Sequence, residues 1–200
     1  MNDVTTVALI GVGGQGILLA ASIIAETASS EGLRVKGSEV HGMAQRGGSV
    51  VSTVRFGTQV WSPVSPRHAD VVVATELLEG HRGLELLGPG GALVCAVTTR
   101  IAPGGVLRGK EDYPVDLEGA AAGRGVRLVA IDAEGLAREA GTARATNVVL
   151  LGAASAVLPF DGESWQRGLA AAVPAKILEV NLRAFALGRG AVVGEGVPSA

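Results

Sequence analysis

A short apolar run that ends in a glycine-rich turn constrains the fold of this chain more than any other feature. Residues 6–10 read TVALI, and GVGGQG follows at residues 11–16. The apolar run is typical of a buried strand in a parallel sheet. In the pattern Gly11-x-Gly13-x-x-Gly16, the glycines permit a tight turn, a close approach of backbone to a ligand, and close packing of a helix on the strand. The segment therefore predicts a strand, a turn and a helix, which is the opening of an α/β fold.

The chain continues this alternation of strands and helices. A hydrophobic fraction of 48% with only 3% aromatic residues fits a buried sheet made of small aliphatic side chains. Apolar runs and helical spacing define the elements that we expect, which are strands at 33–40, 69–76, 92–97 and 126–132 and helices at 17–30, 76–87 and 133–140. Asp132 stands where its side chain would cap the last of these helices.

Two further segments carry turn signals. Residues 49–56 alternate in character, residues 59–64 follow them, and Gly57 and Thr58 lie between the two runs. Because glycine readily adopts the positive φ of a tight turn, the pattern predicts a β-hairpin. Residues 101–125 are rich in glycine and proline, so we expect a loop there.

The C-terminal part of the chain is predicted to be helical. Helices are expected at 146–158, from residue 162, and at 174–187. Gly188 fits a residue that ends the last helix in a left-handed conformation, and residues 191–200 are expected to be a loose tail. Since no linker divides the chain, we expect one Rossmann-like α/β domain at 1–190. It should have a mostly parallel sheet flanked by helices, with a β-hairpin insertion and a helical C-terminus.

The glycine loop by itself leaves its ligand open. Free N–H groups at a helix N-terminus favour an anion, which suggests a phosphate-bearing ligand. A dinucleotide is one candidate, because Glu39 follows Gly16 by 23 residues, about where an acidic residue would contact a ribose. Gln15, however, puts a bulky side chain inside the loop. A different phosphate ligand, a structural turn or a subunit contact would also fit this loop.

A second motif, EVHGMAQRGG at residues 39–48, crowds polar side chains among glycines. Arg46 can bind a carboxylate or phosphate through two parallel hydrogen bonds. His41 can exchange protons near neutral pH, and Gln45 can both donate and accept hydrogen bonds. The same residues would also fit a turn held together by its own polar side chains.

Charge and cysteine content exclude several classes of function. The net charge is −2 without a basic stripe, so we expect no nucleic-acid partner. No secretory signal or long apolar span is evident, so we expect no membrane association and a cytoplasmic location. The single cysteine, Cys95, lies in the apolar run ALVCAV and is expected to be a buried strand residue. One cysteine allows neither an internal disulfide nor a cysteine-ligated metal site, and no metal site is predicted.

The two motifs at this spacing resemble a known family. GVGGQG and SEVHGMAQRGGSVVSTVRFG, followed by SPV and ADVVVATE, resemble the gamma-type subunit of the 2-oxoacid:ferredoxin oxidoreductases, and in particular the small subunits of the indolepyruvate branch. The sequence NLRAFALG at residues 181–188 also resembles the last helix of that family. The resemblance therefore spans nearly all of residues 5–188.

The resemblance implies an enzyme subunit that is not active alone. The family oxidatively decarboxylates 2-oxoacids, transfers the acyl group to coenzyme A and passes electrons to ferredoxin, using thiamine diphosphate with Mg and 4Fe–4S clusters. In the indolepyruvate branch these cofactors belong to a large partner subunit. The sequence agrees, since one cysteine cannot ligate a cluster and no GDG with a downstream Asn is found to hold thiamine diphosphate. The chain is then expected to complete a hetero-oligomer, for instance a heterotetramer, and to help bind coenzyme A.

The resemblance also directs attention to the two glycine-rich segments. The candidate cofactor-binding residues are Gly11, Gly13, Gly14, Gln15, Gly16, Gln45, Arg46, Gly47 and Gly48. No catalytic residue is expected in this chain, although Glu39, His41 and Arg46 are candidates for an auxiliary role. We expect EVHGMAQRGG to meet the large subunit or the edge of its active site.

Two other functions compete with this one. A stand-alone NAD(P)-binding Rossmann oxidoreductase would bind the cofactor by itself and would need a catalytic Lys, Tyr or His, and none stands out after residue 100. A nucleotide-binding scaffold module would lack a partner that carries thiamine diphosphate and clusters.

Overall fold

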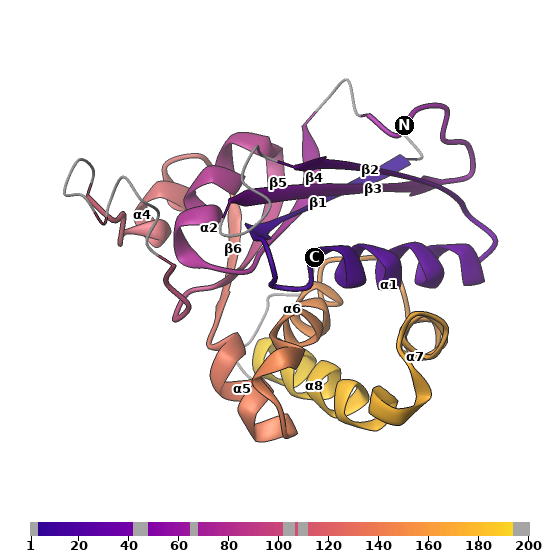
Figure 1. The fold of residues 1–200 in the computed structure, drawn as a ribbon. Helices are drawn as coiled ribbons and strands as arrows, with labels where there is room; N and C mark the ends of the chain where they lie inside the picture. Colours follow the sequence, from indigo (N-terminus) through magenta and orange to yellow (C-terminus); the bar gives the residue numbers. More distant parts are fainter. Residues whose placement is uncertain (1–3, 42–47, 65–67, 102–106, 108–111, 194–200) are drawn as a thin grey trace.

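The computed structural model describes residues 4–41, 48–64, 68–101, 107 and 112–193. Within these residues six strands form one sheet in the order β2-β3-β1-β4-β5-β6 (Figure 1). Their bounds are Val4–Val12 (β1), Arg34–His41 (β2), Ser49–Gly57 (β3), Ala69–Ala74 (β4), Leu87–Ala96 (β5) and Arg127–Ile131 (β6). Neighbours from β1 through β4 and β5 to β6 pair in parallel, whereas β3 is antiparallel to both β1 and β2. The predicted α/β fold with a mostly parallel sheet is confirmed.

Helices cover the sheet on both faces, and the two faces have separate cores (Figure 1). The helical elements are α1 (Ile17–Ser30), α2 (Leu77–Gly83), η1 (Leu84–Leu86), α4 (Leu117–Ala122), α5 (Ala133–Ala140), η2 (Ala143–Ala145), α6 (Thr146–Ala154), α7 (Gly162–Ala172) and α8 (Ala175–Val193). Because successive strand residues point to opposite faces, Val7 and Leu9 of β1 pack on the α1, α6, α7 and α8 side. Ala8 and Ile10 pack on the side of α2 and α4.

The sheet does end in an antiparallel β-hairpin, but β2 and β3 form it, so its predicted position around Gly57 and Thr58 is wrong. β3 ends at Gly57, and residues 59–64 form no strand. Instead β3 inserts between β1 and β2. The Arg55 side chain donates hydrogen bonds to the carbonyls of Ser62 at 2.6 Å and Val64 at 3.1 Å, which holds this segment without a backbone ladder. The intervening Pro63 has no N–H to donate to such a ladder.

Three predicted helix and loop boundaries also need correction. Residues 101–125 are not all loop, because they contain α4, whose N-cap Asp116 accepts a hydrogen bond from the Gly119 N–H at 2.8 Å. The helix predicted at 146–158 ends at Ala154. The last helix does not end before Gly188 but continues to Val193.

Gly188 has a packing role instead of a terminating one. A Cβ built at Gly188 would lie 1.9 Å from the carbonyl oxygen of Val149, so the glycine lets α8 approach the backbone of α6.

The cap predicted for Asp132 is confirmed, since its side chain accepts a hydrogen bond from the Gly135 N–H at 3.0 Å. None of the helices in the described part of the chain is both long and apolar enough to cross a bilayer.

Candidate functional site

The carboxyl ends of the parallel strands lie along one edge of the sheet, which we call the carboxyl edge. In α/β sheets ligands bind at this edge. The glycine loop at residues 11–16 follows β1, Thr75 and Glu76 follow β4, and Asp132 follows β6. Because β3 runs in the opposite direction, its first residue, Ser49, reaches the same edge. The polar segments after these strands are therefore gathered in one region.

The structure joins the two sequence motifs at this edge. The Gly13 N–H donates a hydrogen bond to the Gly48 carbonyl oxygen at 3.0 Å. Gly14 and Gly16 have positive φ angles of 101° and 74°, which side chains other than glycine rarely adopt. The glycine loop and the end of EVHGMAQRGG thus form one continuous backbone surface.

The Gln15 side chain holds the glycine loop from within. Its carbonyl oxygen accepts hydrogen bonds from the Val12 N–H at 2.7 Å and from the Thr75 hydroxyl at 2.6 Å. Its amide nitrogen donates to the Thr75 carbonyl at 3.2 Å. A Cβ at Gly11 would lie 1.9 Å from the Thr75 hydroxyl oxygen, so this glycine makes room for Thr75. Gln15 and Thr75 therefore fill the space over Gly11.

Asn147 fixes the other end of the loop, where α1 begins. This buried side chain donates a hydrogen bond to the Gly16 carbonyl at 3.0 Å, and a Cβ at Gly16 would lie 2.6 Å from the Asn147 amide nitrogen. The first N–H bonded within α1 is that of Ala20, which donates to Gly16. The N–H groups of residues 17–19 have no acceptor within the helix and remain available to an anion or to a partner.

The sequence alone did not indicate site roles for Thr75 and Asn147. Thr75 lay in the last two residues of the strand predicted at 69–76, where a polar residue at the carboxyl end of a buried strand was a usable signal. Asn147 is separated from Gly16 by 131 positions, and no local pattern connects the two.

The second motif is only partly described. Glu39 is exposed on β2, and Gly48 is placed beside Gly13. The backbone of His41 belongs to β2, but its side chain lies outside the described residues, as do Gln45, Arg46 and Gly47. The predicted roles of these residues stay predictions.

The topology disfavours a dinucleotide site. In such a site the acidic residue that contacts the ribose ends the strand next to the glycine loop. Here β3 lies between β1 and β2, so Glu39 is one strand, about 4.8 Å, farther from the loop. Gln15 and Thr75 also occupy the space over the first glycine.

A buried carboxylate network lies next to the glycine loop. Glu76 is fully buried and accepts hydrogen bonds from the Glu79 N–H at 2.6 Å, the Ile101 N–H at 3.3 Å and the Tyr113 hydroxyl. Burial and this hydrogen bond to Glu76 raise the pKa of Tyr113 above its ordinary value. The network holds the chain on both sides of residues 102–111 to the start of α2.

Glu79 ties α2 to the beginning of β3. Its carboxylate accepts a hydrogen bond from the Ser49 hydroxyl at 2.6 Å and forms an ion pair with Arg82 at 2.5 Å. The carboxylates of both Glu76 and Glu79 therefore already have hydrogen-bond donors from neighbouring residues of the fold. This pattern indicates structural roles for the two carboxylates.

Cys95 is buried in β5, as predicted. Burial, followed by the nearby Glu76 carboxylate, raises the pKa of its thiol to about 12, so little thiolate forms at neutral pH. Among the described residues no group of three or more His, Cys, Asp or Glu side chains could hold a metal ion. The carboxyl edge thus presents backbone donors and ordered glycine turns, which suit binding better than bond-making chemistry.

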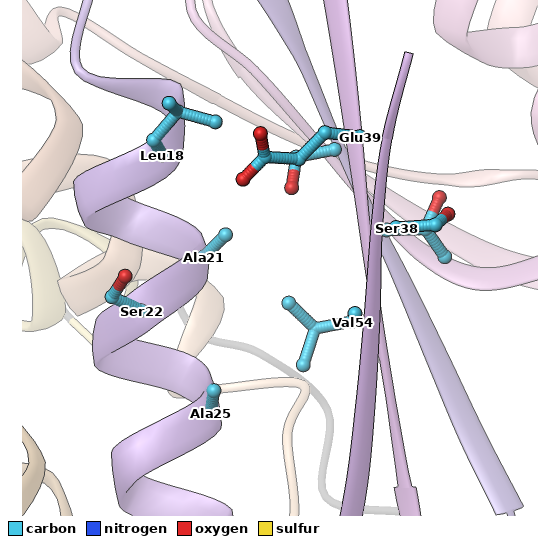
Figure 2. A pocket seen from close by; sticks show the side chains of 10 residues that line it. Leu18, Ala21, Ser22, Ala25, Ser38, Glu39 and Val54 are labelled. Carbon is cyan, nitrogen blue, oxygen red and sulfur yellow. The ribbon is translucent and has the colours of Figure 1, made fainter. Parts of the chain in front are cut away.

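A groove of about 410 Å³ runs between α1 and the strands β2 and β3. It is lined by Leu18, Ala21, Ser22, Ala25, Gly37, Ser38, Glu39, Ser52, Thr53 and Val54. Figure 2 shows the side chains of Glu39 and Val54 directed toward α1, while that of Ser38 is directed away from it.

Comparisons with known proteins define the class of this chain. A family model described as pyruvate ferredoxin/flavodoxin oxidoreductase matches residues 6–191. The chain therefore belongs to the pyruvate ferredoxin/flavodoxin oxidoreductase family, and the resemblance seen in its motifs is confirmed.

Its similar relatives include archaeal subunits that share one name. The chain is 41% identical over 188 residues to "Indolepyruvate oxidoreductase subunit IorB" of Thermococcus kodakarensis, covering 91% of this chain and 93% of the relative. It is 37% identical over 199 residues to the subunit of the same name in Archaeoglobus fulgidus, covering 97% and 98%.

Solved structures share the fold. The gamma subunit of a keto/oxoacid ferredoxin oxidoreductase from Geobacter sulfurreducens matches with a TM-score of 0.74 at 23% identity, covering 95% of this chain and 99% of that one. A 2-oxoglutarate:ferredoxin oxidoreductase from Magnetococcus marinus, solved with 2-oxoglutarate, coenzyme A and succinyl-CoA, matches with a TM-score of 0.76 at 21% identity. This chain is covered to 99% in the second match, but it corresponds to only 33% of that longer chain.

Proposed function

We propose that this chain is the small subunit of a thiamine-diphosphate-dependent 2-oxoacid:ferredoxin oxidoreductase that acts on indolepyruvate or another aryl pyruvate. The observation that carries the proposal is the 41% identity over 93% of a relative that is itself a subunit of an indolepyruvate oxidoreductase. Nearly the whole chain is matched, so the likeness is not confined to a common nucleotide-binding turn. Residues 1–190 act as one domain in this proposal.

The redox cofactors belong to a large partner subunit in this proposal. A 4Fe–4S cluster needs several cysteine ligands, whereas this chain has one, Cys95, which is buried in a central strand. Thiamine diphosphate with Mg, and the clusters that pass electrons to ferredoxin, are accordingly assigned to the partner. The assembly is a hetero-oligomer in the cytoplasm.

The carboxyl edge is the surface through which this chain completes the complex. The glycine loop is locked by Gln15, Thr75 and Asn147, so it presents its backbone without further ordering. Because Gly48 is bonded to Gly13, the segment EVHGMAQRGG ends at the same surface. Arg46 and Gln45 act there as polar anchors for the large subunit, and Glu39 and His41 are auxiliary to its active site.

Coenzyme A is the ligand that this surface helps to receive. The N–H groups of residues 17–19 lack acceptors within α1, and such a helix terminus favours the phosphates of the cofactor. The carboxylates at this edge, including Glu39, oppose an anion. Arg46, or a cation of the large subunit, therefore supplies the compensating positive charge.

The proposal is tested by reconstitution. The chain is co-expressed with a large subunit from the same organism that carries thiamine diphosphate and cluster motifs, and the reduction of ferredoxin is measured with indolepyruvate, phenylpyruvate or pyruvate in the presence of coenzyme A. We expect the two subunits to co-purify, activity to require both, and an aryl pyruvate to give the highest kcat/KM. Activity of this chain alone, or full activity of the large subunit without it, contradicts the proposal.

One variant tests the assignment of Arg46 in the same assay. Arg46→Ala should weaken assembly or raise the KM for coenzyme A by roughly tenfold or more, the usual scale for removing a charged hydrogen bond. Arg138→Ala is the control, because its exposed ion pair with Glu134 lies on α5 and is expected to contribute little. Unchanged association and unchanged kinetics in Arg46→Ala rule out its assigned role.

A further inference from the structure

The strand β2 has an unpaired outer edge. It is the first strand in the sheet order, and within the described residues no other strand pairs with its outer side. Open edges are sites where another chain adds a strand through backbone hydrogen bonds. The groove between α1 and β2 opens beside this edge, so an added strand would place every second side chain against α1.

Nothing in the packing around the middle of β2 requires a glycine at Gly37. Its φ is not positive, and a Cβ built there would meet only the Thr53 carbonyl oxygen, at an ordinary contact distance of 3.7 Å. Glycine within a strand weakens it and often marks a place where another molecule approaches closely. At this position the missing side chain keeps the groove open between Val54 and the small residues Ala21 and Ala25 of α1.

Glu39 gives the same groove a negative end. Its carboxylate is directed from β2 toward α1 near Leu18 (Figure 2). Across the described part of the chain it forms no hydrogen bond or ion pair. An occupant that brings a positive charge next to Glu39 would complement it, whereas an anion would be repelled.

We propose that β2 and this groove bind an extended segment of the large partner subunit, which adds a strand to the sheet. An apolar side chain of that segment lies beside Gly37, and a Lys or Arg two residues away faces Glu39. The two positions share one face of the added strand because strand side chains alternate. The inference rests on the proposed function, since the segment belongs to the large subunit.

Gly37→Val is the decisive variant, because stability and binding should change in opposite directions. Valine favours strands and has room here, so the melting temperature of the isolated chain should stay the same or rise. The new side chain fills the groove, so the Kd for the purified large subunit should rise by roughly tenfold or more, as for a lost interface anchor.

Two further variants control the experiment. Ser38→Val makes a comparable change on the neighbouring residue. Ser38 borders the groove, but its side chain is directed away from α1, so the Kd should change by less than about threefold. Glu39→Lys should weaken binding, and the loss should grow as the salt concentration is lowered. An unchanged Kd in Gly37→Val, or an equal loss in Ser38→Val, overturns the inference.

The unsubstituted chain separates this inference from the proposed function. If it does not bind the large subunit, the proposed function fails. If it binds and Gly37→Val binds equally well, only the location of the interface is wrong. If the isolated chain forms a dimer that Gly37→Val abolishes, the occupant is a second copy, which also overturns the inference.

Cross-linking identifies the bound segment directly. Cys95 is buried, so a cysteine introduced by Ser22→Cys in the exposed wall of the groove is the reactive thiol. A maleimide photocross-linker at this position should capture a peptide of the large subunit with an apolar residue two positions from a Lys or Arg. Capture of a segment without this pattern contradicts the proposal.

Discussion

Gly188 and Gly190 are two residues apart in α8 but meet different surroundings. A Cβ at Gly188 would lie 1.9 Å from the Val149 carbonyl oxygen, whereas a Cβ at Gly190 would meet nothing within 4 Å. Gly188→Ala should therefore push α8 away from α6 and destabilise the fold by about 1–3 kcal/mol, the usual cost of overpacking. Gly190→Ala should stabilise it by about 0.5–1 kcal/mol, because alanine loses less backbone freedom in a helix.

Urea unfolding of both variants measures the difference in free energy of unfolding. A shift of the two midpoints in the same direction would contradict the close approach of α6 and α8.

At the scale of one residue, the sequence predicts a role only when the interacting residues are close together in the chain. The Asp132 cap was predictable because donor and acceptor are three residues apart. The roles of Gly188 and Asn147 were not, because each depends on a residue far away in the chain.

At the scale of elements, prediction succeeded where the pattern was long and local. The predicted helix at residues 17–30 has the observed bounds, because its apolar stripe repeats over several turns and glycines flank it. The hairpin was predicted with the wrong pair of strands, because alternation and glycine identify a strand and its end but not its partners. β3 pairs with β2 and β1, and Arg55 holds the segment that looked like the second strand. The missed α4 depends on the Asp116 cap within a glycine-rich segment.

The N-terminus of α5 should make stability depend on pH in the acid range. Hydrogen bonds from the Thr98 hydroxyl and the Gly135 N–H hold the pKa of Asp132 below its ordinary value. A lowered folded-state pKa means that the ionised cap stabilises the protein above the ordinary pKa of about 3.9, and that this contribution is lost as the pH falls through the folded-state pKa. Since Asp132 is exposed, solvent reduces the effect.

Two substitutions of Asp132 separate the cap from its charge. Asn also caps helices but does not titrate, so Asp132→Asn should keep α5 intact at neutral pH and flatten the loss of stability below about pH 4. Asp132→Ala should lose about 1 kcal/mol at neutral pH. Urea midpoints measured from neutral to acid pH check both outcomes. An acid dependence in Asp132→Asn that equals that of the unsubstituted chain would assign it to other carboxylates.

On the scale of the whole molecule, the outer side of α8 differs from the carboxyl edge and β2 in the polar groups that it exposes. The outer side of α8 carries exposed charged residues such as Lys176 and Glu179, which water solvates, and Glu179 also pairs with Arg183 at 2.7 Å. The carboxyl edge and β2 instead leave the N–H groups at the start of α1, an open strand edge and the carboxylate of Glu39 without partners in the described chain. A binding partner gains more by covering the second set, because backbone groups and an unpaired charge are then satisfied.

Hydrogen exchange on the assembled complex tests this asymmetry. Binding of the large subunit should slow amide exchange in residues 13–19 and 34–40, and it should leave residues 175–190 unchanged, because only amides that gain acceptors or lose solvent are protected. In a complex formed with Gly37→Val at saturating large subunit, the protection at 34–40 should weaken more than that at 13–19, since the groove is blocked while the glycine loop is intact. Protection confined to α7 and α8 would move the interface to the helical layer. The glycine loop, for all its resemblance to a cofactor site, would then serve only to connect β1 to α1.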